Sequence, residues 1–107
     1  MKVVTHYGEY EVTPTKTEYC CNGRLAIELV EKDGFPFATL TVNIVPSVLD
    51  EMDDIPNDVA FVDTNNCPWA EKFIRDNNLG HPTGVYGHSG FCVYPLYKFD
   101  LSKLQNT

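Results

Sequence analysis

Basic residues are few in this 107-residue chain, in which eight lysines and arginines stand against fifteen aspartates and glutamates, for a formal net charge of −7. Proteins that bind nucleic acid directly neutralise its phosphates with clustered lysine and arginine side chains. The shortage of basic residues therefore argues against charge-driven binding, and we expect no direct nucleic-acid partner.

Long apolar runs are also missing. The longest uncharged apolar run falls far short of the roughly 18–20 residues that a membrane-spanning helix needs. Residues 1–7 contain neither the apolar segment nor the small-residue cleavage site of a secretory signal peptide. We therefore expect a cytoplasmic protein with no membrane partner, whose cysteines stay reduced.

The spacing of zinc ligands is absent as well. The four cysteines are Cys20, Cys21, Cys67 and Cys92, and no pair of potential ligands shows the x₂ or x₄ spacing of a zinc site. The adjacent Cys20 and Cys21 would point to opposite faces of a strand, which suits neither a shared metal nor a redox pair. We expect no metal and no cofactor, and interpret the cysteines as small buried hydrophobic residues.

What is present is the composition of a soluble folded domain, with 43% hydrophobic and 12% aromatic residues. The length predicts one domain over residues 1–107. Alternating patterns rich in β-branched and aromatic residues predict strands. These strands cover residues 3–7, 10–12, 24–31, 35–44, 59–63 and 91–99.

The clearest unit is a hairpin closed by Asp33 and Gly34, the favoured pair of a type I′ turn. In its second strand an apolar set that includes Leu40 alternates with a set that includes Thr41, so one side is expected to be buried and the other wetter. Earlier in the chain, Pro14 is expected to break the first strand or to place it at an edge, because proline has no N–H to donate.

A main helix is predicted over residues 68–78, introduced by capping residues at 64–66 and ended by Gly80. A shorter helix is predicted over residues 47–52 with Ser47 as its N-cap. Residues 101–107 read as a polar tail with one helical turn. This order predicts an α+β fold, an antiparallel sheet of about five strands with the main helix packed on one face. The expected core consists of Val3, Leu25, Ile27, Leu29, Leu40, Val42, Ile44, Phe61, Trp69, Phe73, Ile74, Phe91, Val93 and Leu96.

The negative charge is concentrated in one stretch of the chain. Residues 33–71 contain eight acidic residues and no lysine or arginine, one negative charge more than the net charge of the whole chain. Five of the eight are Asp50, Glu51, Asp53, Asp54 and Asp58. They form either a solvated loop that keeps the protein soluble or a surface that binds a basic partner. Their spacing does not match a calcium-binding loop.

Catalytic residues are weakly indicated. Cys67 is the best nucleophile, because the predicted helix start would lower the pKa of its thiol. No histidine is placed beside it by any spacing. Residues 87–90, Gly-His-Ser-Gly, lack the G-x-S-x-G spacing of a nucleophile elbow. We therefore expect a protein that is not an enzyme.

Residues 81–90 carry three glycines, a proline and two histidines, and we interpret them as a loop. Backbone N–H groups of such a loop can cradle a phosphate, although the glycine spacing matches no known phosphate-binding motif. Because loops often carry function, a ligand site remains an alternative. Its residues would be His81, Gly84, Tyr86, His88 and Ser89.

Two strings in the second half of the chain are specific, TNNCPWA at residues 64–70 and YPLYKFD at residues 94–100. With residues 7–12, 36–44 and 79–84, they resemble an uncharacterised family of small acidic proteins found in phages, conjugative elements and gut bacteria of the clostridial type. The resemblance covers roughly residues 3–101. It carries over no catalytic residue.

This resemblance implies a mobile-element context. Small acidic proteins of mobile elements often inhibit host defence by occupying a basic nucleic-acid groove, to which opposite charge attracts them. We therefore expect an inhibitor of the anti-CRISPR or antirestriction type. Its partner would be a host nuclease or effector complex with a basic surface, bound through the acidic residues at 50–58. The alternative is a small-ligand or nucleotide-binding module that uses residues 84–90.

Overall fold

The computed structural model describes residues 1–45 and 47–106, and within them the chain forms nine strands, one α-helix and two 3₁₀ helices. The strands are β1 (Lys2–Thr5), β2 (Gly8–Glu18), β3 (Leu25–Glu31), β4 (Pro36–Thr39), β5 (Thr41–Val42), β6 (Val59–Val62), β7 (Gly80–Ser89), β8 (Cys92–Phe99) and β9 (Gln105–Asn106). The helices are η1 (Val48–Glu51), α1 (Ala70–Asp76) and η2 (Leu101–Lys103). In the described residues no helix is both long and apolar enough to cross a membrane.

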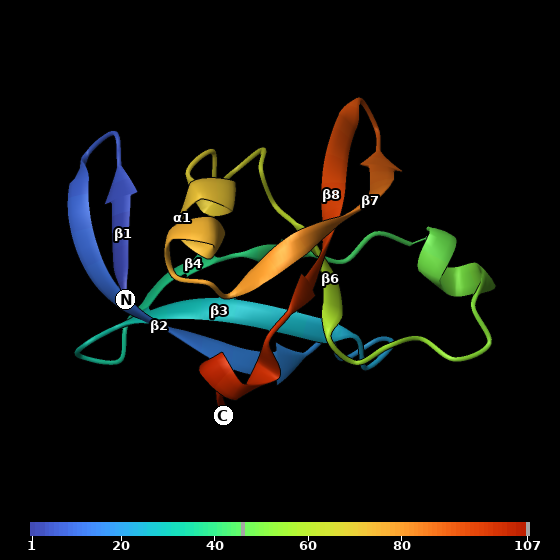
Figure 1. Ribbon diagram of the computed structural model, residues 1–107, viewed down its shortest axis with the longest axis horizontal. Coiled ribbons are helices and arrows are strands. Elements are labelled where there is room, and N and C mark those ends of the chain that lie inside the picture. Colours follow the sequence, from blue (N-terminus) through green and yellow to red (C-terminus); the bar gives the residue numbers. More distant parts are fainter. Residues whose placement is uncertain (46, 107) are drawn as a thin grey trace.

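The α+β class is confirmed, but the strands form two sheets (Figure 1). In the first sheet the order is β1-β2-β3-β4, and β9 lies beside β2 in parallel. In the second sheet the order is β5-β6-β8-β7, and every pair is antiparallel. The prediction of a single sheet of about five strands is therefore incomplete. The first sheet has five strands, and the later strands form a second sheet.

The chain passes from one sheet to the other between β4 and β5. The predicted hairpin at Asp33 and Gly34 is confirmed, since β3 and β4 pair across that turn. Its predicted type I′ geometry is wrong, because only Gly34 has a positive φ and its N–H donates to the carbonyl of Glu31 at 2.9 Å. The N–H of Leu40 still donates to the carbonyl of Ile27 at 2.9 Å, whereas Thr41 already pairs with Val62 of β6. The single strand predicted over residues 35–44 is therefore two strands, β4 and β5. The prediction that Thr41 lies on a wetter side is wrong, because Thr41 is buried where the chain crosses between the sheets.

Pro14 neither breaks β2 nor makes it an edge strand, since β2 has β3 on one side and β1 and β9 on the other. The strand continues through Pro14, which lies opposite Leu29 of β3. The N–H and C=O groups of Val12 both form hydrogen bonds with Met1, so they point away from β3. Backbone groups two residues apart on a strand point to the same edge, so those of Pro14 point away from β3 as well. On that edge β1 has already ended and β9 begins one residue after the proline. The missing N–H of Pro14 therefore interrupts no ladder.

The core has two parts. The larger part lies between the first sheet, α1 and the second sheet, and α1 contributes Ala70, Phe73 and Ile74 to it. The smaller part lies under η1 and is formed by Ile44, Leu49, Phe61, Tyr94 and Leu96.

Most of the predicted core is buried, Val42 and Trp69 are partly buried, and two members are exposed. The prediction is wrong for Val93, which is half exposed, and for Phe91, whose relative exposure is 107%. Both lie where the β7–β8 hairpin projects beyond the rest of the molecule (Figure 1).

The main helix is shorter than predicted. It runs over residues 70–76, and the capping residues at 64–66 do not cap it. Instead the Asp63 carboxylate accepts hydrogen bonds from the backbone N–H and the side-chain amide of Asn66, at 3.1 and 2.9 Å. Asn78, with a φ of 53°, takes the left-handed position expected for Gly80. Gly80 starts β7, where a Cβ atom would lie 2.4 Å from the carbonyl oxygen of Lys98.

The prediction of a loop over residues 81–90 is wrong, because residues 80–89 form β7 and only Gly90 and Phe91 make the turn to β8. Tertiary pairing with β8 overrides the glycine and proline content, which is accommodated by a bulge between Pro82 and Tyr86. The helical turn predicted in the tail is confirmed as η2, and β9 follows it. Thr107 lies outside the described residues.

Candidate functional site

The predicted acidic surface is anchored to the body of the protein by Asp50. Its carboxylate pairs with the guanidinium of Arg24 and accepts the backbone N–H of Ser47 at 2.5 Å. Ser47 in turn caps η1 by accepting the N–H of Leu49 at 3.3 Å, so the predicted N-cap is confirmed. These bonds, from Ser47 first and Arg24 second, hold the pKa of Asp50 below its usual range. Asp50 therefore positions the segment instead of presenting a free charge.

The other four acids differ in their surroundings. Asp58 lies 3.7 Å from the ammonium of Lys98, which offsets part of its charge. Glu51, Asp53 and Asp54 are exposed, and none of them has an ion-pair partner among residues 1–45 and 47–106. The free negative charge of the candidate surface is thus carried by three residues within and just after η1.

The rest of the acidic stretch lies elsewhere. The turn with Asp33 and the 3₁₀ helix η1 lie toward opposite ends of the long axis of the molecule (Figure 1). Asp63 is nearly buried and orders the turn before α1, and Glu71 lies on α1, where it accepts the hydroxyl of Tyr97 at 2.7 Å. Eight acids that are close in sequence therefore do not form one face.

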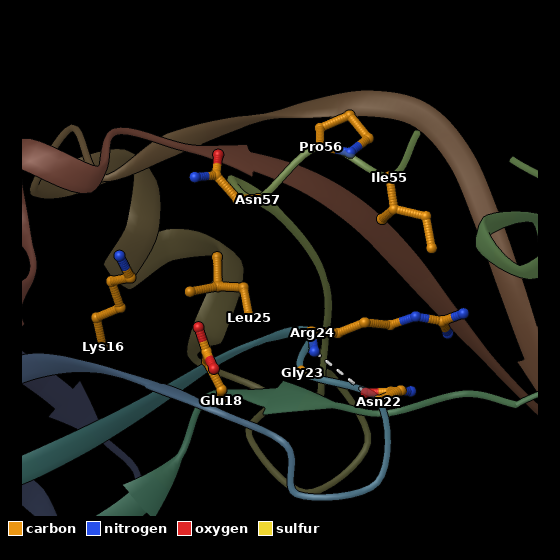
Figure 2. Close-up of a pocket in the computed structure, with 9 residues that line it drawn as sticks. All are labelled: Lys16, Glu18, Asn22, Gly23, Arg24, Leu25, Ile55, Pro56 and Asn57. Atoms are coloured by element: carbon orange, nitrogen blue, oxygen red, sulfur yellow. Dashed lines mark hydrogen bonds between the residues drawn. The ribbon is translucent and has the colours of Figure 1, made fainter. Parts of the chain in front are cut away.

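A small hollow lies beside the anchor, between the turn before β3 and the segment that leads to β6 (Figure 2). Its volume is about 190 Å³. It is lined by Lys16, Glu18, Asn22, Gly23, Arg24, Leu25, Ile55, Pro56 and Asn57. Ligand pockets usually measure roughly 300–1,000 Å³. The size and the mixed charges make this a polar surface hollow rather than a preformed ligand pocket.

The side chain of Arg24 binds Asp50 and the backbone near η1, and it does not point into the hollow. Its side chain is only 10% exposed and extends past Ile55, away from Lys16 and Glu18 (Figure 2). One guanidinium nitrogen donates to the carbonyl of Ile44 at 3.4 Å. The Nε atom is buried and has no hydrogen-bond partner among the described residues. Because Nε is closed off from solvent, it cannot reach a molecule bound in the hollow.

The residues of the predicted ligand loop do not converge. The five residues are all exposed and are spread along β7: His81, Gly84, Tyr86, His88 and Ser89. Along a strand successive N–H groups point to opposite edges, so they cannot cradle one phosphate as a loop can. His81 lines a shallow hollow with Lys98 and Asp100, away from Tyr86 and His88. The structure therefore gives no support to a ligand site formed by these five residues.

The thiols do not form a catalytic centre. Cys67 is 4% exposed, and it precedes Trp69, the N-cap of α1, so it does not start the helix. Burial, with the nearby charge of Asp63, raises the pKa of its thiol to about 11, the reverse of the predicted lowering. Cys20 and Cys21 are exposed, so the prediction of burial is wrong for them. Among the described residues no cluster of three potential metal ligands occurs.

One surface was not anticipated from the sequence. Val85, Tyr86, Phe91 and Val93 project into solvent from the β7–β8 hairpin. The signal that could have found it is the Gly90–Phe91 pair between two alternating stretches, which is typical of a two-residue hairpin turn. The glycines of β7 concealed that pattern.

Comparison with models of protein families matches residues 15–107 to a domain of unknown function, DUF4313. No significant match is found among curated proteins or among solved structures.

Proposed function

This chain belongs to the DUF4313 family of domains of unknown function, and we propose that it is a binding protein of a phage or other mobile element that inhibits a host defence system. The inhibitor is of the anti-CRISPR or antirestriction type. It engages a nuclease or effector complex by covering a basic surface that otherwise holds nucleic acid.

The observation that carries this proposal is that Glu51, Asp53 and Asp54 are exposed and have no ion-pair partner in the part of the chain that the structure describes, next to a helix anchored by Asp50 and Arg24. Because η1 is anchored at Asp50, less conformational entropy is lost when the neighbouring carboxylates meet a row of lysines or arginines. The −7 net charge of the chain adds long-range attraction to a basic partner and raises the association rate.

A role without catalysis agrees with the state of the thiols. The best nucleophile of the sequence, Cys67, is buried, and its thiol has a raised pKa. A thiol of this kind is protonated at neutral pH and reacts poorly. Binding rather than turnover is therefore the activity that the described residues support.

The test is a pull-down with the tagged protein from lysate of a bacterial host that carries CRISPR or restriction systems, followed by affinity measurements on the recovered complex. We expect Asp53→Lys/Asp54→Lys to weaken binding by about tenfold or more, and binding to weaken as salt rises. The matched control is Glu28→Lys/Asp33→Lys, which changes the net charge equally at exposed positions on β3 and on the β3–β4 turn, outside the candidate surface. Binding that responds to neither salt nor the first variant, or recovery of no defence protein, contradicts the proposal.

A further inference from the structure

The β7–β8 hairpin leaves one sheet edge open. β7 is the last strand of the second sheet, and within the described residues it pairs only with β8. Val85, Tyr86, Phe91 and Val93 on this hairpin are all exposed, and Phe91 is fully so. Single exposed apolar residues are common, but a group of four on one projecting element marks an interaction surface. The end of the hairpin near its turn projects beyond the neighbouring elements (Figure 1), whereas Gly87 lies on the smaller core.

The register shows which backbone groups of β7 are free. Tyr86 lies opposite Pro95, which has no N–H, so this is a pair without hydrogen bonds. Bonded and non-bonded pairs alternate in an antiparallel ladder, so Gly87 bonds to Tyr94 and the next pair, which contains His88, is again non-bonded. The N–H and C=O groups of Tyr86 and His88 therefore point away from β8, toward the open edge.

The charge around this edge selects the occupant. Residues 77–99 contain no aspartate or glutamate, and Lys98 is their only lysine or arginine. The edge is nearly neutral, so it offers nothing to the basic partner that the acidic segment would attract. Two copies of a chain with a net charge of −7 repel each other over most of their surfaces. At this hairpin they can meet without bringing carboxylates together.

We propose that a second copy of this chain pairs with the free edge of β7, antiparallel and about a two-fold axis at Gly87, to form a dimer with one continuous sheet. Tyr86 of each copy then exchanges both backbone hydrogen bonds with His88 of the other, because both present free groups at the same edge. The exposed rings of Tyr86 and His88 lie on one face of the joined sheet and contact each other across the axis. Such an interface is isologous, so it closes on itself and uses the edge once.

The interface is small. Tyr86 and Phe91 are the aromatic side chains near the open edge, and at about 150–250 Å² each they offer roughly 300–500 Å² per copy. The total is at the lower end of specific interfaces, where association is weak and transient. Pro82 and the bulge that follows it confine the pairing to the part of β7 near the turn. We therefore expect a dimer that forms and dissociates with concentration.

Amide exchange tests the register directly. We expect the amides of Tyr86 and His88 to exchange fast in dilute protein and to become protected as the concentration rises from about 10 μM to about 1 mM. The amides of Gly87 and Ser89, which bond to β8, are protected throughout. Sedimentation should show the mass rising from one chain to two over the same range. A single-chain mass at every concentration, or no protection of Tyr86 and His88, overturns the proposal.

Two variants distinguish strand pairing at the β7 edge from nonspecific hydrophobic association. His88→Pro removes an N–H that β8 does not use, and we expect it to raise the dimer dissociation constant by about tenfold or more. Phe91→Ser leaves the backbone unchanged and should weaken the dimer less. Phe35→Ser, at an exposed position on the β3–β4 turn, is the matched control and should leave it unchanged. A dimer that persists in His88→Pro, or that is lost in Phe35→Ser, overturns the proposal.

Discussion

The guanidinium of Arg24 pairs with the carboxylate of Asp50 and so joins the turn before β3 to η1, two segments that are 26 residues apart in sequence. Arg24 is nine-tenths buried, whereas Asp50 is partly open to solvent. The same carboxylate closes the first turn of η1 through Ser47. One side chain thus fixes both the position and the conformation of η1, which contains Glu51 and directly precedes Asp53 and Asp54.

The first prediction concerns this anchor. We expect Asp50→Asn to speed amide exchange in η1 by about tenfold while exchange in β3 stays unchanged, because the amide loses the charge-assisted bond to Arg24. Asp54→Asn is the control, since it removes one negative charge from an exposed side chain that has no ion-pair partner among the described residues. The measurement is hydrogen exchange resolved by residue. Equal exchange in the two variants would show that the ion pair does not hold the segment.

The second prediction concerns acid. The pKa of Asp50 is lowered in the folded protein, so its carboxylate adds stability above the unfolded pKa of about 4. That contribution is lost as the pH falls below about 4 and through the lowered folded value. We expect η1 to loosen in this range before the sheets unfold, and Asp50→Asn to abolish this step. Carboxyl chemical shifts recorded during an acid titration check it, and an Asp50 that titrates at its unfolded pKa contradicts it.

Local chemistry predicts the turns of this fold well. Asp33 and Gly34 close a hairpin, and Ser47 caps a short helix, because each of these features depends on residues within one or two turns of chain. The exposure of Glu51, Asp53 and Asp54 also follows from their charge alone. What the residues could not indicate is that Asp50 would be paired, since Arg24 is remote in sequence.

The failures share one cause, which is that the partner strand decides the environment. Residues 80–89 have the composition of a loop but lie in a ladder with β8. Thr41 continues an alternating pattern but is buried where the chain crosses between sheets. Cys67 has the sequence context of a helix start but lies under the crossing chain, where its thiol donates to the carbonyl of Thr39 at 3.7 Å. Neighbours that are distant in sequence override the local pattern in each case.

The third prediction concerns Gly87, which lies directly on the smaller core. A Cβ atom there would lie 2.7 Å from Cε1 of Phe61 and 2.9 Å from Cδ1 of Ile44. We expect Gly87→Ala to lower the free energy of unfolding by about 1–3 kcal/mol, the usual cost of an overpacked core. Ser89→Ala, at an exposed position of the same strand, should change it by less than about 0.5 kcal/mol. Urea denaturation measures both, and equal effects would contradict the close contact.

The fourth prediction concerns thiol reactivity. A pKa of about 11 for Cys67 leaves roughly a hundredfold less thiolate at pH 8 than an ordinary value near 9 does, and burial adds to the protection. We expect iodoacetamide to modify the exposed Cys20 and Cys21 quickly and Cys67 at least about a hundredfold more slowly. Mass spectrometry of digested samples assigns each site. Modification of Cys67 as fast as that of Cys20 would contradict the raised pKa and would make Cys67 a candidate nucleophile.

The last prediction concerns Thr41, which is 3% exposed at the point where the chain changes sheets. Its hydroxyl accepts the backbone N–H of Ile27 at 3.1 Å and shares a hydrogen bond of 2.9 Å with the hydroxyl of Tyr19. Thr41→Val keeps the shape of the side chain but leaves that buried N–H without a partner. We therefore expect the free energy of unfolding to fall by about 1–3 kcal/mol.

Thr39→Val is the matched control for this change, because Thr39 is exposed and lies two residues earlier on the same stretch of chain. Its substitution should alter the free energy of unfolding by less than about 0.5 kcal/mol. Urea denaturation of both variants distinguishes a lost buried hydrogen bond from a general effect of valine in this stretch. If Thr41→Val is as stable as Thr39→Val, the hydroxyl of Thr41 does not stabilise the crossing between the sheets, and burial of Leu40 beside it must be sufficient.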